Sequence, residues 1–297
     1  FSAVAYFFAV YLNRVLNVPA GVIDCSWGGS HIAGWMPEEL LSRYEDVDIS
    51  NAGNPEVADW AQPMIMYNGM LHPLHNYTIR GFLWYQGESN IGRHETYPGR
   101  MADMAALWRG KWGLGELPFY YVEIAPYDYG DARGDWAALL REAQYKAQAL
   151  IPNSGMVSTN DLVGDFESDN IHPRNKKTIG ERLAYMALRN TYGMNGIADR
   201  GPEYVRMEIV DGEAYLSFNH APEGFNRFAG MSGFEVAAED RIFHPAEARM
   251  ADGGRIMVRS DAVKTPVAVR YCFRNYQPGN VANTRELPMV PFRTDNW

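Results

Sequence analysis

The sequence is poor in cysteine and shows no grouping of residues at metal-binding spacing. Cys25 and Cys272 are its two cysteines, too few for a disulfide framework or for a structural zinc site. His72 and His75 lie close together in HPLH, but no third ligand accompanies them, so we expect structural roles for both. We therefore expect no metal and no other cofactor.

Long apolar runs and an excess of positive charge are also missing. No run of eighteen apolar residues occurs, and a transmembrane helix needs about that many. The 36 acidic side chains outnumber the 27 of Lys and Arg, for a formal charge of −9. This balance argues against non-specific binding to nucleic acid or to an anionic membrane surface, and it favours carbohydrate or another small neutral solute as the partner.

The first sixteen residues, FSAVAYFFAVYLNRVL, lack the features of a signal peptide. A signal peptide begins with basic residues and ends in a cleavage site of small residues, and neither is found here. We interpret the segment as an amphipathic helix with Arg14 on its polar side. Since Phe1 stands where an initiator methionine would, we expect the chain to begin within a domain.

Two kinds of pattern divide the 297 residues, which are enough for two domains of ordinary size. Up to about residue 195, short apolar runs alternate with helical patterns, which is typical of a parallel α/β sheet. The runs predict strands at 20–27, 79–86, 118–125 and 154–161, and the patterns between them predict helices at 1–16, 95–112 and 135–151.

From about residue 197, apolar residues instead recur at every second position. Gly, Pro and Asp-Gly separate these runs, which predicts short antiparallel strands in a sandwich. The predicted strands are 203–210, 213–220, 233–238, 254–260 and 266–273. We therefore expect an α/β domain at 1–196 and a smaller β-rich module with an irregular tail at 197–297.

A polar or glycine-rich turn follows each predicted strand of the α/β domain. These turns are SWGGS, QGESN, APYDYG and NDLVGD. In an open α/β sheet such turns gather at the carboxyl edge of the strands, where ligands bind. We expect the four turns and the loop DNIHP (169–173) to face one cleft.

Asp169 and His172 are the candidate acid and base of that cleft. A hydrolase uses a carboxylate to orient an imidazole, and the ring then takes a proton from a serine. Both residues precede a helical pattern whose apolar side would anchor the loop through Ile179, Leu183 and Met186. A histidine before a helix is also commonly a cap or a satisfied surface group, and that alternative stays open.

Gln86, Gly87 and Glu88 provide an amide, an unshielded backbone N–H and a carboxylate after one predicted strand. Such groups bind a developing oxyanion or position a sugar hydroxyl. Gly28 and Gly29 likewise expose N–H groups to a ligand. Each stretch is equally compatible with a tight turn that has no role beyond its shape.

A serine nucleophile is harder to find. Ser26 and Ser30 lie in the glycine-rich turn, but neither sits in a G-x-S-x-G elbow. Glycoside hydrolysis needs only two carboxylates, and nothing in the sequence fixes the separation of any pair. The carboxylates available for that alternative are Glu88, Glu123, Asp161 and Asp165.

Taken together and in order, the motifs resemble the sialate O-acetylesterase family of carbohydrate esterases, in the SGNH-hydrolase superfamily. The resemblance rests on residues 5–37, on 67–90 with WYQGESN, and on DNIHP. The ending at 270–297 is also similar to the end of that family's chains, so the resemblance covers essentially the whole sequence.

The resemblance implies a three-layer α/β/α domain and the removal of acetyl groups from O-acetylated sugars by a serine, without a metal. Matching motif positions implies that Asp169 and His172 are the acid and base. It also implies that Gly28 or Gly29, and Gln86 with its neighbours, belong to the oxyanion and substrate site. Members of the family are commonly secreted, periplasmic or lysosomal. Sialic acid, xylan and other acetylated glycans all remain open as substrates.

One motif of the family is missing. Its nucleophilic serine lies in G-Q-S-N after the first strand, and no G-Q-S-N occurs in residues 1–297. A truncated chain, a precursor cleaved so that the serine lies on another chain, and a serine peptide outside these residues are the open explanations.

We expect a companion segment to carry the serine and complete the fold. Residues 1–297 alone are then expected to have little or no activity. A non-catalytic carbohydrate-binding relative that has lost the serine is the alternative function.

Overall fold

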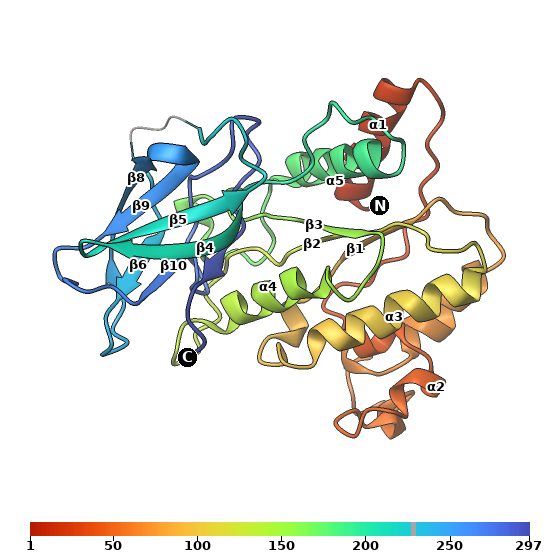
Figure 1. Ribbon diagram of the computed structural model, residues 1–297. Coiled ribbons are helices and arrows are strands. Elements are labelled where there is room, and N and C mark those ends of the chain that lie inside the picture. Colours follow the sequence, from red (N-terminus) through yellow and green to blue (C-terminus); the bar gives the residue numbers. More distant parts are fainter. Residues whose placement is uncertain (227–229) are drawn as a thin grey trace. The chain divides into compact units, whose positions relative to one another are not determined.

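The computed structural model describes residues 1–226 and 230–297, which form two compact units (Figure 1). The first unit consists of Phe1–Ile124, Leu140–Val157 and Lys176–Gly193. The second consists of Ala125–Leu139, Ser158–Asn175 and Met194–Trp297. The domain boundary that we expect between residues 196 and 197 stays a prediction.

The first unit has three layers, as the resemblance of the motifs implies (Figure 1). Its sheet is parallel, in the order β1-β2-β3, with α1 and α5 on one face and α3 and α4 on the other. The bounds are β1 Phe82–Tyr85, β2 Phe119–Val122, β3 Ser154–Val157, α1 Ala3–Leu16, α2 Glu38–Leu41, α3 Tyr97–Trp112, α4 Trp136–Ala147 and α5 Lys176–Asn190. The start of α4, up to Leu139, is counted with the second unit. Short helices of this unit are η1 Ile32–Trp35, η2 Ile49–Asn51, η3 Asp59–Ala61, η4 Tyr67–Leu71, η5 His72–Leu74 and η6 Glu88–Asn90. Within the described ranges, no helix is both long enough and apolar enough to span a membrane.

Strand β2 shows why an apolar run predicts the middle of a parallel sheet. All four of its side chains, in the sequence FYYV, are buried. Helices cover both faces of such a sheet, so a central strand is apolar at every position rather than at every second one. Three of the four expected strands of this unit, those in 79–86, 118–125 and 154–161, are therefore confirmed.

The fourth prediction, a strand at 20–27, is wrong. Among the described residues this segment pairs with no strand and has no regular secondary structure. Most of its residues are exposed, and Ile23 has 46% of its surface accessible. An apolar run forms a strand only where a neighbouring strand accepts and donates its backbone hydrogen bonds, and β1 pairs only with β2 in the described sheet.

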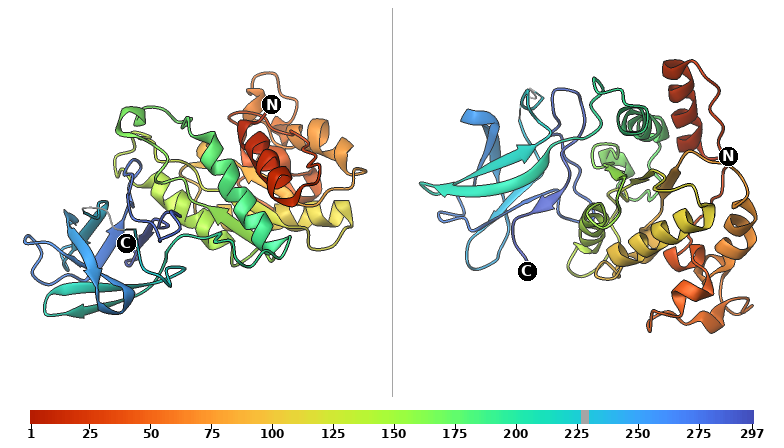
Figure 2. Two further views of the ribbon diagram at one scale, coloured as in Figure 1. Left: turned by 90° about the horizontal axis from the view of Figure 1, so that it is seen from above. Right: turned by 45° about the vertical axis from the view of Figure 1, so that its right-hand side comes forward.

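Helices α1 and α5 lie side by side on one face of the sheet (Figure 2). Gly180 of α5 makes the close approach possible, because a Cβ there would lie 2.6 Å from the carbonyl oxygen of Val4 in α1. The rings of Tyr11 and Tyr185 meet edge to face at 5.1 Å. Ile179, Leu183 and Met186 are buried, as we expect for the apolar side of α5.

The second unit contains two antiparallel sheets of four strands, in the orders β4-β5-β9-β8 and β11-β10-β6-β7. The bounds are β4 Glu203–Val210, β5 Glu213–Asn219, β6 Phe234–Ala237, β7 His244–Pro245, β8 Glu247–Ala251, β9 Arg255–Arg259, β10 Ala268–Tyr271 and β11 Phe292–Arg293, with η7 Asp165–Glu167 and η8 Asp252–Gly254. The five predicted strands correspond to β4, β5, β6, β9 and β10. The predicted β-rich architecture of this part of the chain is confirmed, and β7, β8 and β11 come in addition.

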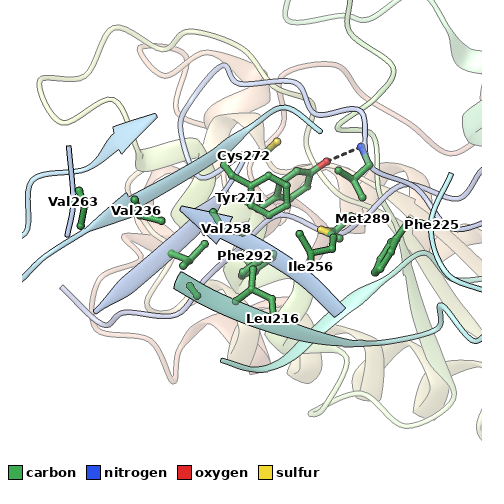
Figure 3. Close-up of a cluster of buried hydrophobic side chains, with 14 residues drawn as sticks. Leu216, Phe225, Val236, Ile256, Val258, Val263, Tyr271, Cys272, Met289 and Phe292 are labelled. Atoms are coloured by element: carbon green, nitrogen blue, oxygen red, sulfur yellow. Dashed lines mark hydrogen bonds between the residues drawn. The ribbon is translucent and has the colours of Figure 1, made fainter. Parts of the chain in front are cut away.

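Side chains from both sheets of the second unit form one apolar core (Figure 3). Leu216 of β5 lies directly opposite Ile256 of β9. In the other sheet, Val236 of β6 lies directly opposite Val269 of β10. All four side chains are inaccessible to solvent. The hydroxyl of Tyr271, within this core, accepts a hydrogen bond of 3.2 Å from the backbone N–H of Val281 (Figure 3).

Gly180→Ala is expected to destabilise the protein by about 1–3 kcal/mol, because the added methyl group overpacks the contact between α1 and α5. This cost exceeds the gain of about 1 kcal/mol that alanine normally brings to a helix interior. Gly110 of α3 is the matched control, because nothing lies within 4 Å of a Cβ built there. Urea unfolding should therefore show Gly110→Ala to be neutral or stabilising, and equal stability of the two variants would contradict the close approach.

Candidate functional site

The buried amide of Gln86 joins two loops of the first unit at the carboxyl end of β1. Its Nε2 donates to the carbonyl oxygen of Ser30 at 2.8 Å and to Oδ1 of Asn90 at 2.7 Å. Its Oε1 accepts from the hydroxyl of Tyr97 at 2.9 Å. An amide NH2 group has two N–H bonds to donate, and both are used here. In this structure Gln86 therefore positions the turns 28–32 and 86–90 relative to each other.

Further buried polar groups surround Gln86. Nε2 of Gln144 donates to the carbonyl oxygen of Gln86 at 3.0 Å, and Oε1 of Gln144 accepts from the N–H of Ile124 at 2.9 Å. Oδ1 of Asn90 also accepts from the N–H of Ile32 at 3.0 Å. Burial raises the pKa of Tyr97, which keeps its hydroxyl a donor. Asn90 lies in the predicted turn QGESN, but the sequence gives no signal for Tyr97 or Gln144, because their partners are 11 to 58 residues away along the chain.

Gly87 is required by its surroundings. Its φ of 157° with ψ of −27° lies outside the regions that side chains normally allow. A Cβ at this position would lie 2.6 Å from Cγ2 of Ile124 and 3.0 Å from Nε2 of Gln144. The bare backbone of Gly87 thus fits against the network, and Glu88 follows it as the first residue of η6.

The turn at Gly28 and Gly29 is exposed and presents its backbone to solvent. Gly29 has a φ of +74°, a conformation that suits glycine, and its carbonyl oxygen accepts from Oγ of Ser89 at 2.6 Å. Within the described ranges, the N–H groups of Gly28 and Gly29 donate no hydrogen bond. Two unengaged N–H groups on a fixed turn are able to bind an anionic oxygen.

Neither serine of this turn has the surroundings of a nucleophile. Ser30 is 4% exposed, and its hydroxyl donates to the carbonyl oxygen of Trp27 at 2.8 Å and accepts from Nε1 of Trp35 at 2.9 Å. The hydroxyl of Ser26 donates to Oδ1 of Asp24 at 2.7 Å. In the part of the chain that the structure describes, no histidine hydrogen-bonds to either hydroxyl.

Asp169 and His172 belong to the second unit, whereas the glycine turn and Gln86 belong to the first. Both side chains are exposed, and no hydrogen bond joins them among the described residues. The backbone N–H of His172 donates to Oδ1 of Asn170 at 3.0 Å. Hydrogen bonds of catalytic groups often form only when substrate is bound, so their assignment as acid and base stays a prediction.

Glu167 holds the loop that carries Asp169 and His172, a role that the sequence analysis missed. Its carboxylate is 5% exposed. It accepts from the N–H of Gly164 at 3.4 Å and from the N–H of Arg174 at 3.3 Å, on the two sides of the loop. The carbonyl oxygen of Gly164 also accepts from the hydroxyl of Tyr276 at 2.9 Å. The backbone of the loop is therefore fixed at both ends.

One of the carboxylates considered for glycoside hydrolysis is unsuitable. Glu123 is completely buried, with 0% of its surface exposed, so it presents no carboxylate to a ligand. Asp161 belongs to the second unit and Glu88 to the first. The side chain of Asp165 lies outside the described part of the structure.

Comparison with known proteins gives the family. The profile described as carbohydrate esterase, sialic acid-specific acetylesterase matches residues 2–189. The chain belongs to this family. The resemblance found in the sequence motifs is thereby confirmed, and the three-layer fold of the first unit is consistent with the SGNH-hydrolase superfamily.

Among curated proteins, the chain is similar to sialate O-acetylesterases of mammals. It is 26% identical to that of Mus musculus over 341 residues, which cover 98% of this chain and 63% of the relative. It is 29% identical to that of Homo sapiens over 233 residues, which cover 74% of this chain and 45% of the relative. The chain thus spans about half to two thirds of the length of these relatives.

Among solved structures, the chain is similar to a carbohydrate acetylesterase from Xanthomonas citri, with a TM-score of 0.86 and 36% sequence identity. The match covers 100% of this chain and 66% of the other. The similarity extends over both units of the chain, so the predicted combination of an α/β/α part and a β-rich part is confirmed.

Gln86→Leu is expected to destabilise the protein by roughly 1–3 kcal/mol, because it leaves the buried Ser30 carbonyl oxygen without its donor and removes one hydrogen bond each from Asn90 and from the Tyr97 hydroxyl. Ser89→Ala is the matched control, since it removes a single exposed hydrogen bond of the same two turns. We expect the control to cost less than about 1 kcal/mol in urea unfolding. Similar losses in both variants would show that the Gln86 network does not hold the turns.

Proposed function

We propose that the chain is part of a serine-dependent carbohydrate O-acetylesterase that removes acetyl groups from sialic acid or other acetylated glycans. The observation that carries the proposal is the exposed turn of Gly28 and Gly29 with its two unengaged N–H groups, fixed beside the Gln86 network. Family membership supports the same reaction class. The acetylated carbohydrate is then the substrate, and the chemistry needs no metal.

In the proposed mechanism, His172 takes the proton of a serine hydroxyl while the serine oxygen bonds to the acetyl carbon. The carbonyl oxygen becomes an oxyanion, which the N–H groups of Gly28 and Gly29 stabilise. The bond from the acetyl carbon to the sugar oxygen then breaks, and His172 returns the proton to that oxygen. Water activated by His172 finally releases acetate and restores the serine. Asp169 orients the imidazole throughout.

A companion segment supplies the serine in this proposal. The hydroxyls of Ser26 and Ser30 are engaged with other groups, and β1 pairs with β2 alone among the described strands. A further strand would pair with the free edge of β1, and the run 20–27 also has a backbone that a neighbouring strand would satisfy. These features support a single companion segment that supplies both the missing strand and the nucleophilic serine.

Exposed apolar side chains support the same segment. Large ones near the start of the chain are Phe1, Tyr6, Val15, Val18, Ile23 and Trp27, with exposed fractions from 39% to 81%. Apolar surface of this kind usually marks a site of contact with another segment or protein. Export to a secreted, periplasmic or lysosomal location is part of the proposal, by analogy with the family. A non-catalytic glycan-binding relative is the second candidate, favoured by the engaged state of both serines of the turn.

His172→Ala in the protein that includes the companion segment is expected to lower the rate of acetate release by roughly 10³-fold or more, by analogy with other triads. His72→Ala is the control, because His72 is likewise an exposed histidine, at the start of η5. Acetate release from an O-acetylated methyl glycoside measures both rates. An unchanged rate in His172→Ala would contradict its role as the base.

Fluorophosphonate labelling followed by peptide mass spectrometry tests the source of the nucleophile. We expect an adduct on a serine outside residues 1–297, and no adduct in His172→Ala. An adduct on Ser26 or Ser30 would contradict the companion segment. The absence of any adduct, together with retained glycan binding, would favour the non-catalytic relative.

A further inference from the structure

Two exposed tryptophans flank the Gly28–Gly29 turn. Trp27 precedes the turn and is 48% exposed, and Trp60 of η3 is 46% exposed. The other tryptophans of the first unit, Trp35, Trp84, Trp108 and Trp112, are all at most 9% exposed. Tryptophan is highly buried on average, so the exposure of these two residues at one turn requires an explanation.

Trp60 is held against the turn by several contacts. Its indole stacks on the imidazole of His31, with ring centroids 5.7 Å apart and planes inclined by 11°. Its carbonyl oxygen accepts from the N–H of His31 at 3.2 Å. A Cβ built on Gly29 would lie 3.7 Å from Cγ of the indole. The indole is therefore in contact distance of the turn that presents the unengaged N–H groups.

The loop that carries Trp60 is itself fixed from within. The side chain of Gln62 is 3% exposed, and its Oε1 accepts from the N–H of Gly53 at 2.7 Å. Its Nε2 donates to the carbonyl oxygens of Asn54 at 3.0 Å and Val57 at 2.8 Å. This buried amide closes the loop 53–62, so Trp60 is exposed on a braced support.

His31 supports the stack as a neutral ring. Burial is the main reason, and the nearby charge of Arg93 the second, that the pKa of His31 is lowered. At neutral pH the imidazole is therefore uncharged, and a cation does not have to be desolvated beneath the indole. The indole of Trp60 thus stacks on His31 and keeps an exposed apolar surface.

We propose that Trp60, backed by His31, is a stacking platform for the pyranose ring of the acetylated sugar. A pyranose presents a face of C–H groups, which packs on the electron-rich face of an indole. A sugar ring on Trp60 places its acetyl substituent next to Gly28 and Gly29. The inference rests on the proposed function for the identity of the ligand, and it adds the residue that binds the sugar as distinct from the ester.

Trp60→Leu tests the platform, because it keeps an apolar side chain and removes the aromatic face. In the protein that includes the companion segment, kcat/KM is measured for an O-acetylated methyl glycoside and for p-nitrophenyl acetate, which has no sugar. We expect kcat/KM for the glycoside, divided by kcat/KM for p-nitrophenyl acetate, to fall roughly tenfold, which corresponds to the loss of one aromatic contact. Most of this fall should come from a higher KM for the glycoside. Trp60→Phe should restore most of the ratio.

Trp136→Leu is the matched control, since Trp136 is 43% exposed and belongs to the second unit. Its ratio should equal that of the unaltered protein. Saturation-transfer NMR of the same glycoside with residues 1–297 gives a readout that needs no catalysis, and the signal should weaken in Trp60→Leu.

The outcomes separate the platform from the proposed function. If the unaltered protein releases acetate and Trp60→Leu has the same ratio of kcat/KM values, the platform is overturned and the proposed function is not. Equal losses on both esters would also overturn it, because they would mean that Trp60 supports the fold or the companion segment. Trp60-dependent glycoside binding without acetate release from any form would support the platform and contradict the esterase. Absence of glycoside binding and of acetate release would overturn both.

Discussion

The hydrogen bonds of the Gln86 amide are the interaction on which the candidate site depends. One side chain supplies two donors and one acceptor, and they reach the Ser30 carbonyl, Asn90 and Tyr97. In a buried environment, leaving a polar group without a hydrogen bond costs more free energy than a formed hydrogen bond contributes. This network therefore has one favourable arrangement. These hydrogen bonds also position the backbone of the Gly28–Gly29 turn, so the direction of its N–H groups does not depend on a side chain within the turn.

Strand pairing is the second constraint, and it explains both what the sequence predicts well and where it is wrong. The helices α1 and α5 are predicted because an apolar stripe at helical spacing needs only a surface to cover, and the sheet provides one. A strand also needs a neighbour to satisfy its backbone. Residues 20–27 have the apolar run but no described neighbour, so the pattern that correctly predicts β2 gives a wrong result there.

The candidate site is predictable to the extent that its chemistry lies in short motifs. Gly28, Gly29 and Gln86 stand out because glycine and amide groups follow predicted strands. Tyr97 and Gln144 do not, since their contacts join positions 11 to 58 residues apart and no local pattern indicates them. The strands β7 and β11 were missed for a related reason: two residues are too few to show a period. The assignments of Asp169 and His172 stay predictions.

The loop of Asp169 and His172 combines a fixed backbone with exposed side chains at these two residues. Glu167 accepts hydrogen bonds from N–H groups on both sides of the loop, and Asn170 fixes the N–H of His172. Under the proposed function, Asp169 orients the imidazole of His172 once the serine and the substrate are bound, whereas the N–H groups of the glycine turn are in place beforehand. In that proposal the fold fixes in advance the donors that meet developing charge, where a preformed arrangement contributes most to the rate.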